Sequence, residues 1–142
     1  MNVAIKNNEL QDEILEVDIY AASVNDWPYI EDSWVRSTFY NTRIARRAHF
    51  DRTKILNRIA LLRGAGAIFN VATADKNILG WACFEVPVLH YVFVKEYYRE
   101  QGIARQLLAP FGSQKVIWCS SWAPLVAKIA KEHKYLRNTS PY

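Results

Sequence analysis

The stretch from Leu89 to Leu108, LHYVFVKEYYREQGIARQLL, decides the fold. It opens with the segment LHYVFV, which is dense in aromatic and β-branched residues, as a buried central strand should be. A short link follows, and the residues from about Gln101 to Ala109 have the pattern of a helix that Pro110 ends. The stretch therefore predicts a strand, a loop and a helix in succession.

The loop of this unit contains the pattern R-x-x-G-x-A, formed by Arg99, Gly102 and Ala104. A helix N-terminus presents unpaired N–H groups and a partial positive charge, glycine lets the backbone approach a phosphate closely, and alanine keeps the first turn free of bulk. Arg99 and Arg105 add positive charge. The pattern favours phosphate binding, although an ordinary strand-to-helix turn that needs a glycine would have the same sequence pattern.

The flanking sequence predicts further elements in a definite order. Strands are expected at 16–22, 67–73, 78–86 and 115–119, and helices from about Trp27 into the thirties, from about Phe50 to Arg63, and over 123–133. No repeat or linker composition marks a boundary, so residues 1–142 are expected to form one domain. The order predicts a mixed α/β fold whose late strands include a parallel pair joined by a helical crossover.

The segment from Leu89 to Leu108 resembles motif A of the GNAT acyltransferase superfamily, in which a hydrophobic strand ending in valine precedes Q/R-x-x-G-x-G/A. The resemblance is strong over 80–109 and continues in the right order over 16–135. It implies a single-domain GNAT-like acyl-CoA N-acyltransferase fold, with a mixed central sheet flanked by helices and an acyl-CoA-binding core at about 78–135. The phrases Asp32-Ser33-Trp34 and 89–95 are also similar to small GNAT proteins encoded by bacteriophages.

This resemblance implies a cosubstrate and a reaction. Acetyl-CoA would lie against the strand, with backbone groups near its end pairing with the pantetheine arm and loop amides holding the pyrophosphate. An acetyl group would pass to an amine, either a small molecule or a protein lysine, by direct attack in a ternary complex. The cofactor-binding residues implied are Val92, Phe93, Val94, Arg99, Gln101, Gly102, Ile103, Ala104 and Arg105.

The sequence departs from the family pattern near its C-terminus. Many members carry a tyrosine in the last helix that protonates the leaving thiolate, and alignment places Ala130 at that position and Lys134 at a family glycine. Ser120, Ser121, another tyrosine or water would have to supply the proton. The chain after Tyr135 is also too short for the closing hairpin of many relatives. This shortened C-terminus implies an acceptor groove that is open or is completed by a second subunit in a homodimer.

An amine acceptor needs a base, and His90 and Glu85 are the candidates on the central strands. Strand alternation places His90 on the face of Val92 and Val94, and its near-neutral intrinsic pKa suits the role. A hydrogen-bonded core histidine is an equally good interpretation. Glu85, near a strand end, ranks second.

The two cysteines, Cys83 and Cys119, lie in apolar stretches without other ligands at zinc spacing. We therefore expect buried thiols and no metal site.

The net charge of +4 combines an acidic N-terminal region with a basic remainder, which suits coenzyme A, a nucleic acid or an acidic protein partner. Arg43, Arg47, Lys54 and Arg58 would share one face of a helix that began early enough, as a nucleic-acid-binding stripe or as a solvated surface. A nucleic-acid-directed enzyme on the same fold and a non-catalytic protein that binds a host factor are thus alternative functions.

No segment has the apolar length of a membrane helix or the pattern of a secretory signal, so a cytoplasmic protein is expected, in the host cytoplasm if a phage encodes it.

Overall fold

The computed structural model describes residues 16–112, 116–120 and 134–137. They form a six-stranded sheet in the order β2-β3-β4-β5-β6-β7. Neighbouring strands from β2 to β5 are antiparallel, whereas β5 with β6 and β6 with β7 are parallel, which confirms the mixed sheet. The strands are β2 (Asp18–Ala21), β3 (Ile68–Ala74), β4 (Asn77–Glu85), β5 (Val88–Val94), β6 (Val116–Cys119) and β7 (Lys134–Arg137).

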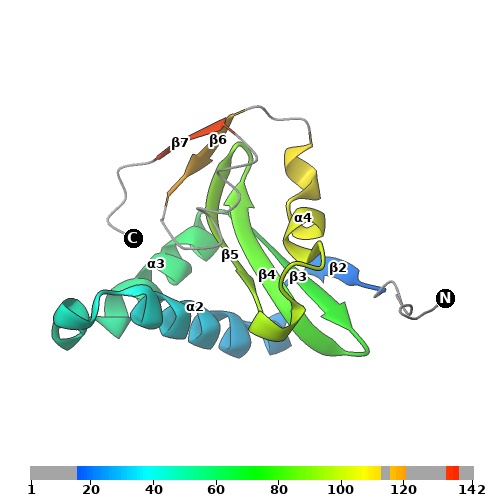
Figure 1. Ribbon diagram of the computed structural model, residues 1–142. Coiled ribbons are helices and arrows are strands. Elements are labelled where there is room, and N and C mark those ends of the chain that lie inside the picture. Colours follow the sequence, from blue (N-terminus) through cyan, green and yellow to red (C-terminus); the bar gives the residue numbers. More distant parts are fainter. Residues whose placement is uncertain (1–15, 113–115, 121–133, 138–142) are drawn as a thin grey trace.

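Helices cover both faces of the sheet (Figure 1). Helix α2 (Trp27–Asn41) packs with α3 (Arg52–Gly64) on one face, and the short α4 (Ile103–Leu107) lies on the other. Short 3-10 turns join these elements at Val24–Asp26, Ile44–His49, Glu96–Tyr98 and Ala109–Phe111. The three layers place the β5–α4 connection at one end of the sheet, beside the strand that the sequence identified as central.

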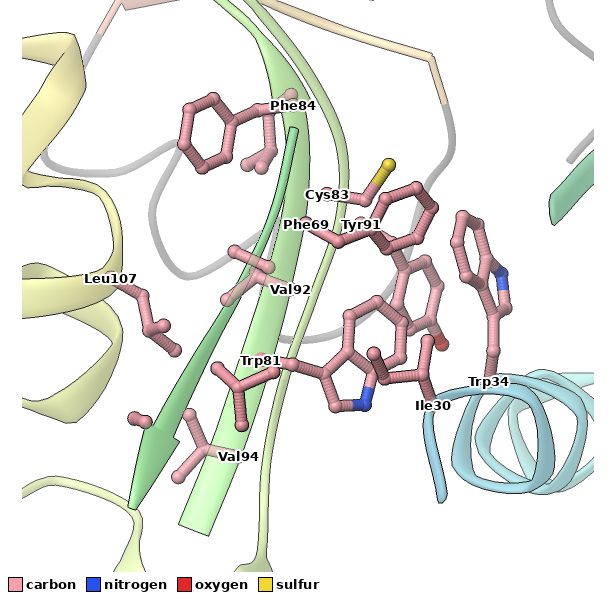
Figure 2. Packing of buried hydrophobic residues seen from close by; sticks show 14 of the residues in the cluster. Ile30, Trp34, Phe69, Trp81, Cys83, Phe84, Tyr91, Val92, Val94 and Leu107 are labelled. Atoms are coloured by element: carbon pink, nitrogen blue, oxygen red, sulfur yellow. The ribbon is translucent and has the colours of Figure 1, made fainter. Parts of the chain in front are cut away.

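The core has two halves separated by the sheet (Figure 2). On the α2 side, the Tyr91 ring stacks on Trp34 and on Trp81, with centroid separations of 4.7 and 5.6 Å. On the α4 side, Val92 and Leu107 lie together. Because Trp34 and Trp81 are almost fully buried, they account for much of the apolar area removed from water on that face.

Local sequence explains where α2 and α3 begin. The carboxylate of Asp26 accepts hydrogen bonds from the amide and the hydroxyl of Ser23, at 2.9 and 3.1 Å, which close the 3-10 turn Val24–Asp26 that leads into α2. Pro28 then lies in the first turn of α2, where a missing amide costs no hydrogen bond. Asp51 accepts from the amide of Thr53 at 2.9 Å and so caps α3. Ile30, Trp34 and Val35 of α2 are buried, as are Ile55 and Ile59 of α3. Both helix predictions are therefore confirmed.

Gly80 sets the spacing between β4 and β5. A Cβ atom at this position would lie 2.4 Å from the carbonyl oxygen of Phe93 and 3.1 Å from the Cα of Val94. Glycine is the one residue that leaves room for this approach of the two backbones. It therefore helps to fix the end of β5, from which the β5–α4 loop leaves.

The structure differs from the expectations in the later part of the chain. Helix α4 spans Ile103–Leu107 rather than 101–109, because Leu108 leaves the helical conformation before the turn containing Pro110. Strand β7, parallel to β6, was not predicted. The helix expected at 123–133, with the aligned Ala130, lies outside the described residues. Among the residues that are described, no helix has both the length and the apolar character to cross a membrane.

The basic residues were expected to share one helix face only if the helix began early enough, and α3 begins at Arg52, so this condition is not met. The chain is extended at Thr42 and again at Phe50, so Arg43 and Arg47 belong to a separate turn before α3. Arg47 folds back and donates to the carbonyl of Tyr40 at 3.0 Å, while Arg58 reaches into the sheet. The basic residues consequently point to different partners, and a continuous stripe does not form.

Candidate functional site

Strands β5 and β6 pair over only a short distance and then part. The register joins Val88 to Trp118 and Leu89 to Cys119. The amide of Trp118 donates to the carbonyl of Pro87 at 2.9 Å, and the amide of Ser120 donates to that of Leu89 at 3.0 Å. Strand β5 continues to Val94, but no described strand pairs with this edge beyond Leu89. The far end of β5 thus keeps an edge without a strand partner in the described part of the chain.

The backbone groups on that edge belong to Val92 and Val94. Lys95 donates its amide to Leu79 of β4 at 2.8 Å, and the carbonyl of Phe93 is also directed at β4, where it would meet a Cβ of Gly80. Successive residues of a strand direct their backbone groups to alternate sides. Val92 and Val94 therefore present theirs away from β4, and Phe93, included in the sequence prediction, directs its carbonyl the other way.

Arg99 holds the loop after β5 against the strand end. Its Nε donates to the carbonyl oxygen of Val94 at 2.8 Å. The loop then bends through Glu100 and Gly102, whose φ angles are +65° and +81°. A positive φ is strained for most L-residues and costs glycine little, which explains the glycine of the R-x-x-G-x-A pattern.

The space and the amides around Gly102 suit an anion. A Cβ atom placed on Gly102 would meet no atom within 4 Å, so the backbone can be approached closely there. The first hydrogen bond of the helix runs from the amide of Gln106 to the carbonyl of Gly102 at 3.1 Å. The amides of Ile103 and Ala104 precede it and have no acceptor within the helix. Of the predicted cofactor-binding residues, Arg99, Gln101 and Gly102 thus lie in the loop after β5, and Ile103, Ala104 and Arg105 are the first residues of α4.

A β-bulge determines where His90 lies. The consecutive residues Cys83 and Phe84 of β4 face Tyr91 and Leu89, which leaves His90 as the extra residue of β5. His90 therefore lies on the side of Tyr91 and α3, and the expectation that it shares a face with Val92 and Val94 is wrong. Simple alternation fails at this position because it assumes a regular ladder.

The bulge brings the two candidate bases together. The Nε2 of His90 lies 2.8 Å from an oxygen of Glu85, and its Nδ1 lies 2.6 Å from the hydroxyl oxygen of Ser120. The Nη2 of Arg58, from α3, donates to the same hydroxyl oxygen at 2.6 Å. Four side chains from α3, β4, β5 and the end of β6 thus form one hydrogen-bonded network where β5 and β6 part. We call these four residues the Ser120 network.

The direction of the hydrogen bonds follows from which atoms can donate. A guanidinium only donates, so the Ser120 oxygen accepts from Arg58 and its own hydrogen is directed to Nδ1 of His90. Nε2 then carries the ring proton and donates to Glu85. Burial and the nearby Arg58 charge lower the pKa of His90, against the opposing effect of Glu85, which keeps the imidazole neutral near pH 7. His90 is thereby a proton acceptor at Nδ1.

Arg58 is the network member that the sequence placed in the basic stripe and not among the candidate catalytic residues. Its position in the sequence indicates a buried side chain, because Arg58 lies three residues after Ile55 and four before Leu62, on the apolar face of α3. Burial lowers the pKa of its guanidinium.

Both cysteines are buried, as predicted, and burial raises the pKa of the Cys83 and Cys119 thiols, that of Cys119 to about 11. Neither thiol is therefore a nucleophile at neutral pH.

Comparison with known proteins identifies the fold. No protein-family model matches the sequence, and no curated protein matches it. Among solved structures, a GCN5-related N-acetyltransferase from Rhodopseudomonas palustris is similar, with a TM-score of 0.59 and 14% identity over 86% of this chain and 83% of that one. A putative acetyltransferase from Salmonella typhimurium, solved with its cofactor acetyl-CoA, has a TM-score of 0.51 and 17% identity over 68% of this chain and 61% of that one.

The present chain thus spans about three fifths of the Salmonella protein. At these identities the likeness concerns the fold, a mixed sheet flanked by helices. The chain therefore has the fold of the GCN5-related N-acetyltransferases.

Proposed function

We propose that the protein is an acetyl-CoA-dependent N-acetyltransferase whose cosubstrate lies along the β5 edge and the loop of residues 99–105. The observation that carries the proposal is the parting of β5 from β6 immediately before that loop. It leaves the backbone groups of Val92 and Val94 without a strand partner among the described residues. A ligand with amide groups can bind such an edge as an added strand would.

The residues around the loop fit the rest of coenzyme A. The open space at Gly102 and the first-turn amides of Ile103 and Ala104 suit the pyrophosphate. Arg99 and Arg105 add positive charge, partly offset by Glu100. A ligand amide that binds the carbonyl of Val94 would replace Arg99 there, and the guanidinium could then pair with a phosphate.

The Ser120 network is the proposed source of proton transfer. Bound acetyl-CoA would supply an acetyl thioester for direct attack by an amine, which has to lose a proton. His90 and Glu85 form the proposed base, since the imidazole is neutral and the carboxylate stabilises its charged form. The side chain of Glu85 is 46% exposed and provides a path for the proton to solvent. The acceptor is proposed to be a small amine or a protein lysine.

The test is isothermal titration of the protein with acetyl-CoA and with free coenzyme A at fixed moderate salt. The proposal predicts binding of both, weakened strongly by Gly102→Glu because the new side chain fills the anion site with negative charge. Gly64→Glu is the matched control, since Gly64 also has open space but lies at the end of α3. Absence of binding to either ligand would leave a protein of this fold with another function.

Thiol release in the presence of a panel of amines and lysine peptides then tests transfer. An amine-dependent increase in release that His90→Gln reduces is the expected result.

A further inference from the structure

The Ser120 hydroxyl has surroundings unlike those of Ser33 and Ser37 in α2. Ser33 donates to the carbonyl of Tyr29 at 2.6 Å and accepts from Nε1 of Trp81 at 2.8 Å. The hydroxyl of the half-buried Ser37 lies 2.7 Å from that of Tyr91, so the contacts of both serines are with uncharged groups. Ser120 instead lies between a guanidinium and an imidazole, each 2.6 Å away. A hydroxyl placed between a cation and a neutral base is arranged to lose its proton.

We propose that Ser120 is an activated nucleophile that accepts acyl groups from thioesters and activated esters. Its Oγ contacts His90, and the opposite nitrogen of His90 contacts Glu85. A nucleophile, a base and an acidic residue that orients the base are the three parts of a nucleophilic triad. In serine proteases Nε2 of the histidine contacts the serine and Nδ1 contacts the acid. Here Nδ1 contacts Ser120 and Nε2 contacts Glu85, so the base still lies between the nucleophile and the acid. The inference goes beyond amine acetylation, because the enzyme itself becomes the acyl acceptor.

The proposed reaction balances within the network. The Ser120 oxygen forms a bond to the acyl carbon, the bond from that carbon to the leaving sulfur or oxygen breaks, and the hydroxyl proton passes to Nδ1 of His90. His90 then gives this proton to the leaving thiolate or alcoholate. In the second step His90 takes a proton from water, whose oxygen forms a bond to the acyl carbon. The bond from that carbon to the Ser120 oxygen breaks, and His90 returns the proton to this oxygen as the carboxylic acid leaves. No oxidant or metal is needed.

Arg58 and Glu85 have distinct parts in this step. Arg58 donates to the Ser120 oxygen and stabilises negative charge as the proton leaves. Glu85 accepts from Nε2 and stabilises the imidazolium that forms. Arg58 acts directly on the reacting hydroxyl. Glu85 acts only through His90 and is therefore a positioning residue.

A small ester tests this proposal separately from the proposed coenzyme A site. Ser120 is 4% exposed, so p-nitrophenyl acetate, a small acyl donor that does not need the loop of residues 99–105, is the probe. The readouts are release of p-nitrophenolate and the mass of peptides containing Ser120. We expect Ser120-dependent release, with an acetyl group on Ser120 when deacylation is slow. Release or an adduct independent of Ser120, or neither in the folded wild-type protein, would overturn the proposal.

Three variants separate chemistry from folding. Ser120→Ala should abolish release, and His90→Asn, which can still accept a hydrogen bond from Ser120 but cannot take its proton, should lower it by at least about 100-fold. Ser37→Ala is the matched control and should retain the wild-type rate. Full activity of a folded His90→Asn protein would contradict the triad.

Failure here and failure of the proposed function can be distinguished. Coenzyme A binding without Ser120 acylation would leave direct amine acetylation as the function. Acylation without coenzyme A binding would instead retain the triad and remove the coenzyme A site.

Discussion

Replacement of Gly80 by alanine tests how β4 and β5 hold the end of the site. The new Cβ would lie 2.4 Å from the Phe93 carbonyl oxygen, and its other close contacts are also atoms of β5. A relaxed carbon–oxygen contact is about 3.3 Å, so the strands must separate locally by nearly 1 Å. Backbone cannot move aside as a flexible side chain can, and we expect the ladder hydrogen bonds beside Phe93 to lengthen.

The expected loss of stability follows from these contacts. Overpacking costs about 1–3 kcal/mol, and each weakened ladder bond adds up to about 1 kcal/mol. The reduced freedom of the unfolded alanine chain returns about 0.4–1 kcal/mol. Gly80→Ala should therefore lower the free energy of unfolding by about 1–4 kcal/mol.

Urea unfolding measures this loss directly, as a lower midpoint with an unchanged m-value. Gly64→Ala is the control, because its Cβ would meet nothing within 4 Å, and it should raise stability by up to about 1 kcal/mol. An unchanged or higher midpoint for Gly80→Ala would refute the close approach of β4 and β5. In the same variant, coenzyme A binding should weaken, since Val94 lies opposite Gly80.

Three further predictions concern the core, the histidine and the loop. Trp34→Ala should lower the free energy of unfolding by about 3–5 kcal/mol in urea titrations, because this buried ring packs on Tyr91 and Trp81; a loss below about 1 kcal/mol would contradict that packing. Burial lowers the pKa of His90 below the ordinary histidine value of 6.5, with Glu85 and Arg58 as the charged neighbours that act on it. The unfolded chain then binds the proton more tightly, so this contribution to stability is complete above about pH 6.5 and is lost as the pH falls through the folded-state pKa. Thermal melts below pH 6.5 should show that stability falls less steeply with decreasing pH in His90→Gln than in the wild type. An identical pH dependence in the two proteins would exclude His90 as its source. Arg99→Met should weaken acetyl-CoA binding by roughly 10-fold in calorimetry, the effect of one charge-assisted contact of about 1.4 kcal/mol, and unchanged affinity would place the phosphates elsewhere.

Local patterns predicted the part of the fold that local forces determine. The strand at Val88–Val94, the loop and the helix beginning at Ile103 follow from a hydrophobic run, a glycine and a helical pattern that are adjacent in the chain. The positive φ of Gly102 fits a turn that needs a glycine, and the open space beside it fits the close approach of a phosphate. The candidate anion site could therefore be located from the sequence.

The position of His90 could not be predicted in the same way. The bulge that turns it toward α3 results from the register between β4 and β5, which no local pattern encodes. Its contact with Ser120 joins residues 30 positions apart, and that of Arg58 with Ser120 joins residues 62 apart. The sequence identified His90 and Glu85 as candidates, but only the folded sheet shows that they belong to one network. Similarly, the basic stripe assumed one continuous helix, whereas the extended backbone at Phe50 starts α3 anew.

The most direct test of the account is to map coenzyme A binding onto the backbone amides by NMR, for which a chain of 16.5 kDa is well suited. Titration with free coenzyme A should shift the amides of Val92, Val94 and 102–105 in proportion to occupancy, and it should leave β2 (Asp18–Ala21) unchanged. This result would place the ligand on the β5 edge and the loop, as the account requires. Shifts confined to other elements, or none at millimolar coenzyme A, would contradict it.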